Sequence, residues 1–197
     1  MKQIIVGLLA LAAAGGAPLE QGERDRAMSH LHATRKVFLD SVAGLSDAQW
    51  NFKPAPERWS IAECAEHITV SEDTLFEFIQ QTMKSPAEPE KKAEVRGKDE
   101  MILKMMPDRS VKAKAPEFLE PKRRWPDHAE LIAHFKQSRD RNIAYIQTTG
   151  DDMRSHFRVH PFMKTIDAYQ MMLLLSAHCE RHTLQINEVK TDPNYPK

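Results

Sequence analysis

The sequence predicts an all-α protein, an antiparallel four-helix bundle with a long crossover between its second and third long helices. Four long segments carry apolar residues at helical spacing, whereas the alternating β-branched runs that are typical of strands are scarce. Only seven glycines occur in 197 residues. A chain of this length can bury a real core, so we expect one bundle domain over residues 18–197.

The first long helix and a short turn after it are indicated by an apolar stripe and a capping signal. Apolar residues from Ala27 to Leu45 follow a helical repeat and predict a helix over residues 23–43. Ser46 is followed three residues later by Gln49, the spacing of a capping box. We therefore expect a short helical turn there, before two prolines stop it.

The second long helix is expected over residues 61–84. Ser60 and Glu63 have the spacing of a capping box, which marks its start. The following residues 85–126 contain six prolines, many charges and little periodicity, so they predict a long connection with a short helix at 99–106. The connection either covers the mouth of a site or crosses the bundle as a solvated link, and its composition favours the solvated link.

The third and fourth long helices complete the predicted bundle. Asp127 and Glu130 have capping-box spacing and begin a helix that continues to about residue 149. Thr165 is the expected N-cap of the fourth helix, which reaches about residue 190. We place His156 and His160, between these two helices, in a loop, although they repeat a four-residue spacing.

Charge excludes two classes of partner. Lysine and arginine total 28, and aspartate and glutamate total 28, so the chain has no net charge to attract nucleic acid or a membrane surface. The basic run at residues 122–124 is too short to form a nucleic-acid patch and is expected on a solvated face. We therefore expect a small-molecule partner.

Residues 1–17 have the pattern of a signal peptide. A single basic residue, Lys2, precedes an apolar stretch that ends in small residues. The stretch is too short to span a membrane, so no stable membrane anchor is expected. The interpretation predicts export to the periplasm or the medium. If the segment is instead an ordinary N-terminal tail, the protein is cytoplasmic.

Three histidines are the candidate functional residues. His178 and His182 stand four residues apart, so they share one helix face, which also carries apolar residues. By themselves they fit a polar flank better than a metal site. His67 lies two turns into the second helix and also points toward the predicted core. Three inward imidazoles are enough for a facial metal site with open positions.

The residues around these histidines resemble the DinB-like family. The first half of the resemblance lies in Leu45-Ser46-Asp47-Ala48-Gln49-Trp50, Trp59-Ser60-Ile61-Ala62-Glu63 and Glu66-His67-Ile68. The second half lies in His160-Pro161-Phe162, Ala177-His178, Arg181-His182 and Gln185-Ile186. The resemblance implies an antiparallel four-helix bundle with a divalent metal on three histidines, which map onto His67, His178 and His182. Cys179 departs from the polar residue expected after the first histidine of the pair.

The function that the sequence favours is metal-dependent catalysis. The resemblance implies zinc or nickel as the metal, with iron or manganese as alternatives, and relatives that include thiol transferases and isomerases. We expect a metal-dependent hydrolase or thiol transferase of unknown substrate. The general base is not identified; Glu63, Glu66, Ser71 and Asp73 are the polar residues near His67. The rival interpretation is a non-catalytic, exported metal-binding bundle or interaction module, with a homodimer as one form, or a bundle without metal.

The two cysteines, Cys64 and Cys179, each lie close in sequence to a proposed ligand. Two separate buried thiols are the first expectation. A disulfide in an oxidising compartment comes second. Cys64 as a fourth metal ligand comes third.

Overall fold

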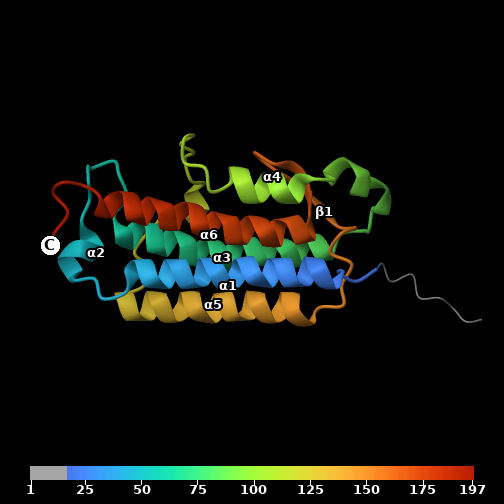
Figure 1. Cartoon of the computed structure of the whole chain (residues 1–197), viewed down its shortest axis with the longest axis horizontal. Helices are drawn as coiled ribbons and strands as arrows, with labels where there is room; N and C mark the ends of the chain where they lie inside the picture. The colour runs from blue at the N-terminus through green and yellow to red at the C-terminus, as the bar shows by residue number, and fades with distance from the viewer. Residues whose placement is uncertain (1–16) are drawn as a thin grey trace, which may run out of the picture.

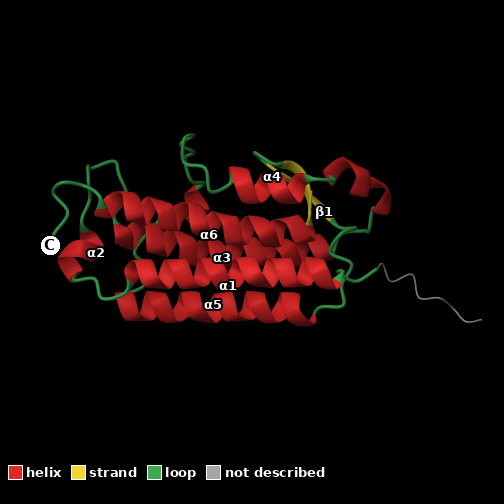
Figure 2. Cartoon of the chain, viewed as in Figure 1, coloured by secondary structure: helices red, strands yellow, loops and turns green. Residues whose placement is uncertain are grey.

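The computed structural model describes residues 17–197, so nearly all of the predicted signal peptide lies outside the described residues. Four long helices form the body of the molecule (Figure 1): α1 (Gln21–Val42), α3 (Ile61–Met83), α5 (His128–Thr148) and α6 (Ala168–Lys190). The shorter elements are α2 (Asp47–Asn51), η1 (Pro89–Val95), α4 (Lys98–Met105), η2 (Glu117–Leu119), β1 (Phe157–His160) and β2 (Lys164–Asp167). The predicted all-α four-helix bundle is confirmed, with one small hairpin added (Figure 2).

The helices follow the order α1, α6, α3, α5 around the bundle. The pairs α1/α5 and α3/α6 are antiparallel, whereas α1/α6 and α3/α5 run in the same direction. The contacts that establish the two parallel pairs are Thr34–Ser176 and Ser41–Lys190 for α1 and α6, and Glu72–Arg139 and Phe76–Tyr145 for α3 and α5. The long connection between α3 and α5 makes the second parallel pair possible, because it returns the chain to the end at which α3 began.

The predicted helix starts are confirmed at α2 and α3. Ser46 accepts the backbone N–H of Gln49, and Ser60 accepts that of Glu63. Both reciprocal side-chain bonds are also present, so each is a complete capping box. At α5 the Asp127 side chain accepts from the backbone of Glu130, which is half of the box that we expected.

The predicted start of α6 is wrong by two residues. Asp167, rather than Thr165, is the N-cap, and it exchanges bonds with Gln170 in a capping box. Thr165 instead pairs with Val159 in the hairpin of β1 and β2. The loop that we expected around His160 is therefore a strand. Each strand has only four residues, is partly exposed and pairs only with the other strand. So short a segment shows too little alternation of apolar and polar residues for the sequence pattern to indicate a strand.

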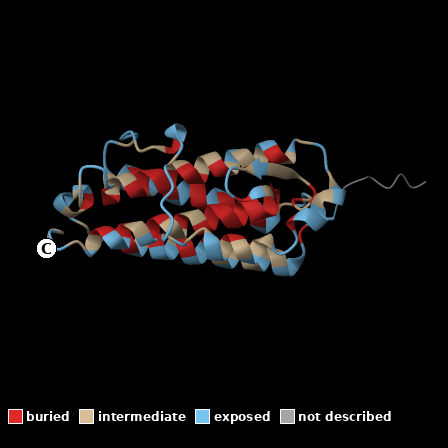
Figure 3. Ribbon diagram, turned by 90° about the horizontal axis from the view of Figure 1, so that it is seen from above, coloured by how far each residue is buried: buried red, intermediate tan, exposed pale blue. Residues whose placement is uncertain are grey.

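The core lies between the inner faces of the four helices (Figure 3). The connection between α3 and α5 also contributes to it. Val95, Ile102 and Leu119 are buried, and the predicted short helix is present as α4, which packs against α6. The expected solvated crossover is therefore only partly right: most of the connection is exposed, but these three apolar side chains attach it to the bundle. In the part of the chain that the structure describes, no helix is long and apolar enough to cross a membrane.

A charged network lies inside the bundle. The Arg139 guanidinium on α5 pairs with the Glu72 carboxylate on α3, and both side chains are essentially inaccessible to solvent. Arg139 also donates to the Leu31 carbonyl and the Thr34 hydroxyl on α1, each at 2.7 Å. Asn142 donates to Glu72 at 2.9 Å. The network joins three helices, including the one that carries His67.

Candidate metal centre

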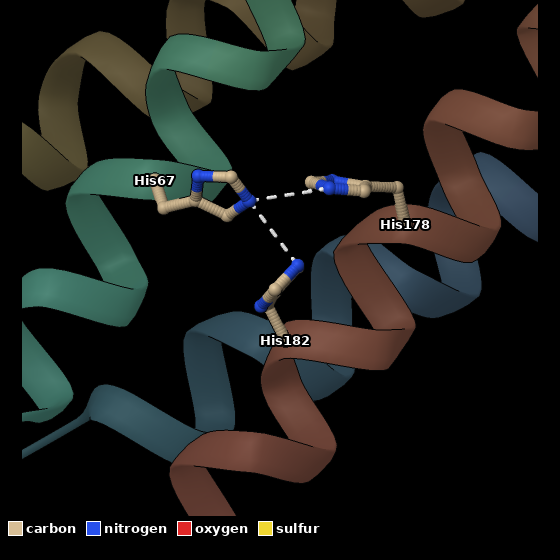
Figure 4. A group of neighbouring side chains, drawn as sticks. All are labelled: His67, His178 and His182. Atoms are coloured by element: carbon tan, nitrogen blue, oxygen red, sulfur yellow. Dashed lines mark hydrogen bonds between the residues drawn. The ribbon is translucent and has the colours of Figure 1, made fainter. Parts of the chain in front are cut away.

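The structure brings the three predicted histidines together (Figure 4). His67 comes from α3, and His178 and His182 come from successive turns of α6, which packs beside it. The Nε2 atom of His67 lies 3.2 Å from Nε2 of His178 and 3.1 Å from Nε2 of His182. Within the described residues, no cysteine or carboxylate joins this group. The convergence follows from the antiparallel packing of α3 on α6, which sets the face of His67 against the face of the other two.

The spacing of the Nε2 atoms fits a common metal ion. With metal–nitrogen bonds of about 2.0–2.1 Å, two ligand nitrogens are about 2.9 Å apart at a right angle and about 3.4 Å apart in a tetrahedron. The two separations from His67 fall between these limits. Three ligands on one side leave coordination positions for water or a substrate.

The protons on two of the rings are located by their hydrogen bonds. His67 Nδ1 lies 2.8 Å from the Leu119 carbonyl oxygen, which can only accept, so this Nδ1 carries a proton. His182 Nδ1 lies 2.8 Å from the Gln185 side-chain oxygen, which also accepts from Arg109 at 3.2 Å. The neutral rings therefore present two bare Nε2 lone pairs to each other. Such lone pairs repel unless a cation lies between them, and this is the observation by which the donor set fits a metal.

Burial keeps these rings neutral. Burial, with a smaller effect of Arg124 in the same direction, lowers the pKa of His67 to about 4, against the opposite effect of the Leu119 carbonyl. The pKa values of His178 and His182 also lie well below the ordinary value, through burial and then through neighbouring positive charge. A neutral imidazole is the form that binds a metal, so the site is ready to bind without first losing protons.

The four polar residues near His67 have different partners. Glu63 caps α3 and pairs with Lys53 at 2.9 Å. Glu66 accepts backbone N–H groups of the connection, and Asp73 binds His134 and Ser138, each at 2.6 Å. Ser71 is buried and its hydroxyl has no hydrogen-bond partner among the described residues. No carboxylate of this set is therefore free to act as a general base.

The remaining sequence candidates lie outside the centre. His156 Nδ1 is 2.9 Å from the Ser85 carbonyl, and His160 Nδ1 accepts backbone N–H groups of the hairpin turn. Cys64 and Cys179 are both buried and free, as first expected. Burial raises the pKa of both thiols, that of Cys179 to about 11, so neither is available as a thiolate.

Sequence reasoning did not find the groups that hold the rings. Gln185 stands three residues after His182, and this spacing is a signal that could have identified it. Arg109 and the Leu119 carbonyl come from the connection, and their sequence neighbourhoods carry no such signal. Trp59 forms one wall, with its ring centroid 4.9 Å from that of His67 and 6.1 Å from that of His182.

The fold and the three-histidine centre define a helical bundle with a candidate metal site between two of its helices. The family model of the DinB superfamily matches residues 30–186. The chain belongs to the DinB superfamily.

Two individual proteins are similar to this chain. YuaE of Bacillus subtilis (strain 168), an uncharacterized protein, is 26% identical over 163 residues, which are 83% of this chain and 96% of YuaE. The solved structure of YfiT from Bacillus subtilis matches with a TM-score of 0.60 at 15% identity, covering 90% of this chain and 91% of YfiT. YfiT is described as a probable metal-dependent hydrolase with an unusual four-helix bundle topology. At this identity the likeness shows the fold.

Proposed function

We propose that this protein binds one divalent cation through His67, His178 and His182 and hydrolyses a small-molecule substrate there. The observation that carries the proposal is the convergence of three Nε2 atoms, two of them shown by their Nδ1 partners to present bare lone pairs. The description of YfiT as a probable metal-dependent hydrolase supports the same class of reaction. Zinc and nickel are the first metals to test, followed by iron and manganese.

The residues of the chain have separate roles in this proposal. Bound to neutral imidazoles, a Zn²⁺ ion would keep its full charge, polarise a substrate oxygen and lower the pKa of a bound water to about 7. The Leu119 carbonyl and the Gln185 side chain hold two of the rings in the binding tautomer. Trp59 packs beside His67 and His182 and shields this side of the centre from water. A dry wall strengthens electrostatic interactions within the site.

Metal content tests the binding step. Protein purified without chelator should contain close to one divalent ion per chain, measured by plasma mass spectrometry. His67→Ala, His178→Ala and His182→Ala should each contain almost none. His156→Ala and His160→Ala are matched controls and should keep the wild-type content, since their Nδ1 atoms bind backbone groups and neither ring belongs to the three-histidine cluster. Full metal content in His178→Ala and His182→Ala would place the ion at another site.

Activity tests the reaction. The protein should be assayed with a panel of esters and amides, and separately with thiol acceptors and electrophiles, before and after removal of the metal by a chelator. Hydrolysis that disappears with the metal and returns with added Zn²⁺ or Ni²⁺ is the expected result. Turnover confined to the thiol panel would replace hydrolysis by thiol transfer. Metal binding without turnover on either panel would favour a non-catalytic metal-binding bundle.

A further inference from the structure

The residue before His67 makes an unusual set of contacts. Glu66 is buried on α3, and its carboxylate accepts three consecutive backbone N–H groups of the connection. These come from Lys122 at 2.7 Å, Arg123 at 2.8 Å and Arg124 at 3.2 Å. The Arg124 guanidinium adds a charged hydrogen bond at 2.8 Å. A carboxylate out of water needs such partners, and here every one of them belongs to a single short segment.

The backbone of this segment is shaped to receive an anion. Arg123 has a φ of 59°, in the left-handed region that non-glycine residues seldom adopt. This conformation turns successive N–H groups to one side and forms a concave anion-binding nest. Arg124 closes the segment further by donating to the carbonyls of Glu120 at 2.9 Å and Phe118 at 3.3 Å. The ligand of the nest is Glu66 itself.

The same segment contacts His67. Leu119 lies between Phe118 and Glu120, whose carbonyls accept the hydrogen bonds from Arg124. Its side chain is buried, and its carbonyl oxygen is 2.8 Å from His67 Nδ1. Two adjacent residues of α3 therefore bind one segment, Glu66 through its nest and His67 through this carbonyl. If the carboxylate were absent, the three N–H groups would lose their acceptor and the segment would lose its main attachment to α3 at this point.

We propose that Glu66 is a positioning residue for the metal centre. By binding the segment of residues 118–124, it holds the Leu119 carbonyl on His67 Nδ1, which keeps the proton on that nitrogen and the lone pair of Nε2 directed at the cation. The role in metal binding rests on the proposed function. The choice of tautomer is a property of the chain without metal, so the two can be tested separately.

The test compares Glu66→Gln with wild-type protein. Glutamine has nearly the same shape, but it sets an NH₂ group against backbone N–H donors and removes the charge that Arg124 binds. In the metal-free protein, ¹⁵N–¹H correlation spectra of the imidazoles should show His67 protonated on Nδ1 in the wild type and shifted toward Nε2 in the variant. Metal affinity, from competition with a chromophoric chelator, should fall by about 10- to 100-fold, as for other groups that orient metal ligands.

Two further variants distinguish positioning from general damage. Glu63→Gln removes a carboxylate from the same turn of α3, but its partners are Ser60 and Lys53, so the His67 tautomer should not change. Arg124→Met keeps the backbone nest and should give a smaller change in the same direction as Glu66→Gln. If Glu66→Gln does not fold, as judged by circular dichroism, Arg124→Met carries the test.

The outcomes are distinct. A wild-type His67 tautomer in a folded Glu66→Gln, or in Arg124→Met if that variant carries the test, overturns the positioning role even if metal binding falls. A wild-type protein that binds no metal overturns the proposed function but leaves the tautomer comparison decisive for Glu66. Equal effects of Glu63→Gln and Glu66→Gln on the His67 tautomer would also overturn the positioning role of Glu66, because a general loss of charge on α3 would then be the cause.

Discussion

Replacing Arg139 with methionine removes the positive partner from the ion pair inside the bundle. The Glu72 carboxylate would keep the 2.9 Å bond from Asn142 but lose both bonds from the guanidinium. The Leu31 carbonyl and the Thr34 hydroxyl would lose a donor as well. Methionine fills much of the aliphatic volume, so the main consequence is an uncompensated charge rather than a cavity.

The magnitude follows from the burial of the pair. The two side chains are 0% and 1% exposed, so water cannot replace the lost guanidinium without opening the interface between α3 and α5. Breaking a buried pair in this way costs about 3–5 kcal/mol of unfolding free energy. Since domains are stable by only about 5–15 kcal/mol, the variant should lose a large part of its stability. Removing both charges together leaves no unpaired ion and should cost less.

The assay is equilibrium unfolding in urea, followed by circular dichroism, for wild type, Arg139→Met, Glu72→Leu and the double variant. We expect the double variant to be more stable than Arg139→Met, because it leaves no unpaired ion among the helices; only the neutral side chains of Asn142 and Thr34 lose a partner. Arg35→Met is a control for the loss of an arginine, since Arg35 pairs with Asp140 on the surface, where such a pair is worth about 0–1 kcal/mol. A cost below about 1 kcal/mol for Arg139→Met would refute the argument that the buried pair needs both partners.

Two further predictions concern the metal centre. Gln185→Leu removes the acceptor from His182 Nδ1 and should lower metal affinity by about 10- to 100-fold in chelator competition, whereas Thr191→Ala, at the end of the same helix, should not. Metal-free protein should lose stability as the pH falls from about 6.5 toward 4, because the folded pKa of His67 is about 4 and those of His178 and His182 are also low. The histidines of the unfolded chain take up protons before those of the folded protein. The stability that the neutral buried rings contribute is therefore present above the pKa of the unfolded histidines and is lost as the pH falls to their pKa in the folded protein. Urea unfolding at several pH values in this range should show that the unfolding free energy of His67→Phe depends less on pH than that of the wild type. An equal dependence in the two proteins would contradict the assignment of this loss of stability to His67.

The sequence was sufficient for features that depend on near neighbours. The starts of α2 and α3 follow from capping boxes four residues long, which begin at Ser46 and Ser60, and the structure confirms both. The shared face of His178 and His182 follows from the helical repeat. The start of α6 was misjudged, because Thr165 has the local chemistry of a cap but is used in a strand pair with Val159.

The sequence by itself determined the class of fold, the long helices and the three inward histidines, because helical periodicity and capping are written in residues a few positions apart. The tertiary structure alone decided that α5 runs parallel to α3, that Glu66 fills a nest in the connection, and that the Leu119 carbonyl orients His67. The contacts of Glu66 and His67 each join a side chain to a backbone group more than 50 residues away. Every residue has a backbone carbonyl and nearly every residue a backbone N–H. No residue type therefore marks the backbone groups that will bind a given side chain, and only the packing of the chain selects those groups.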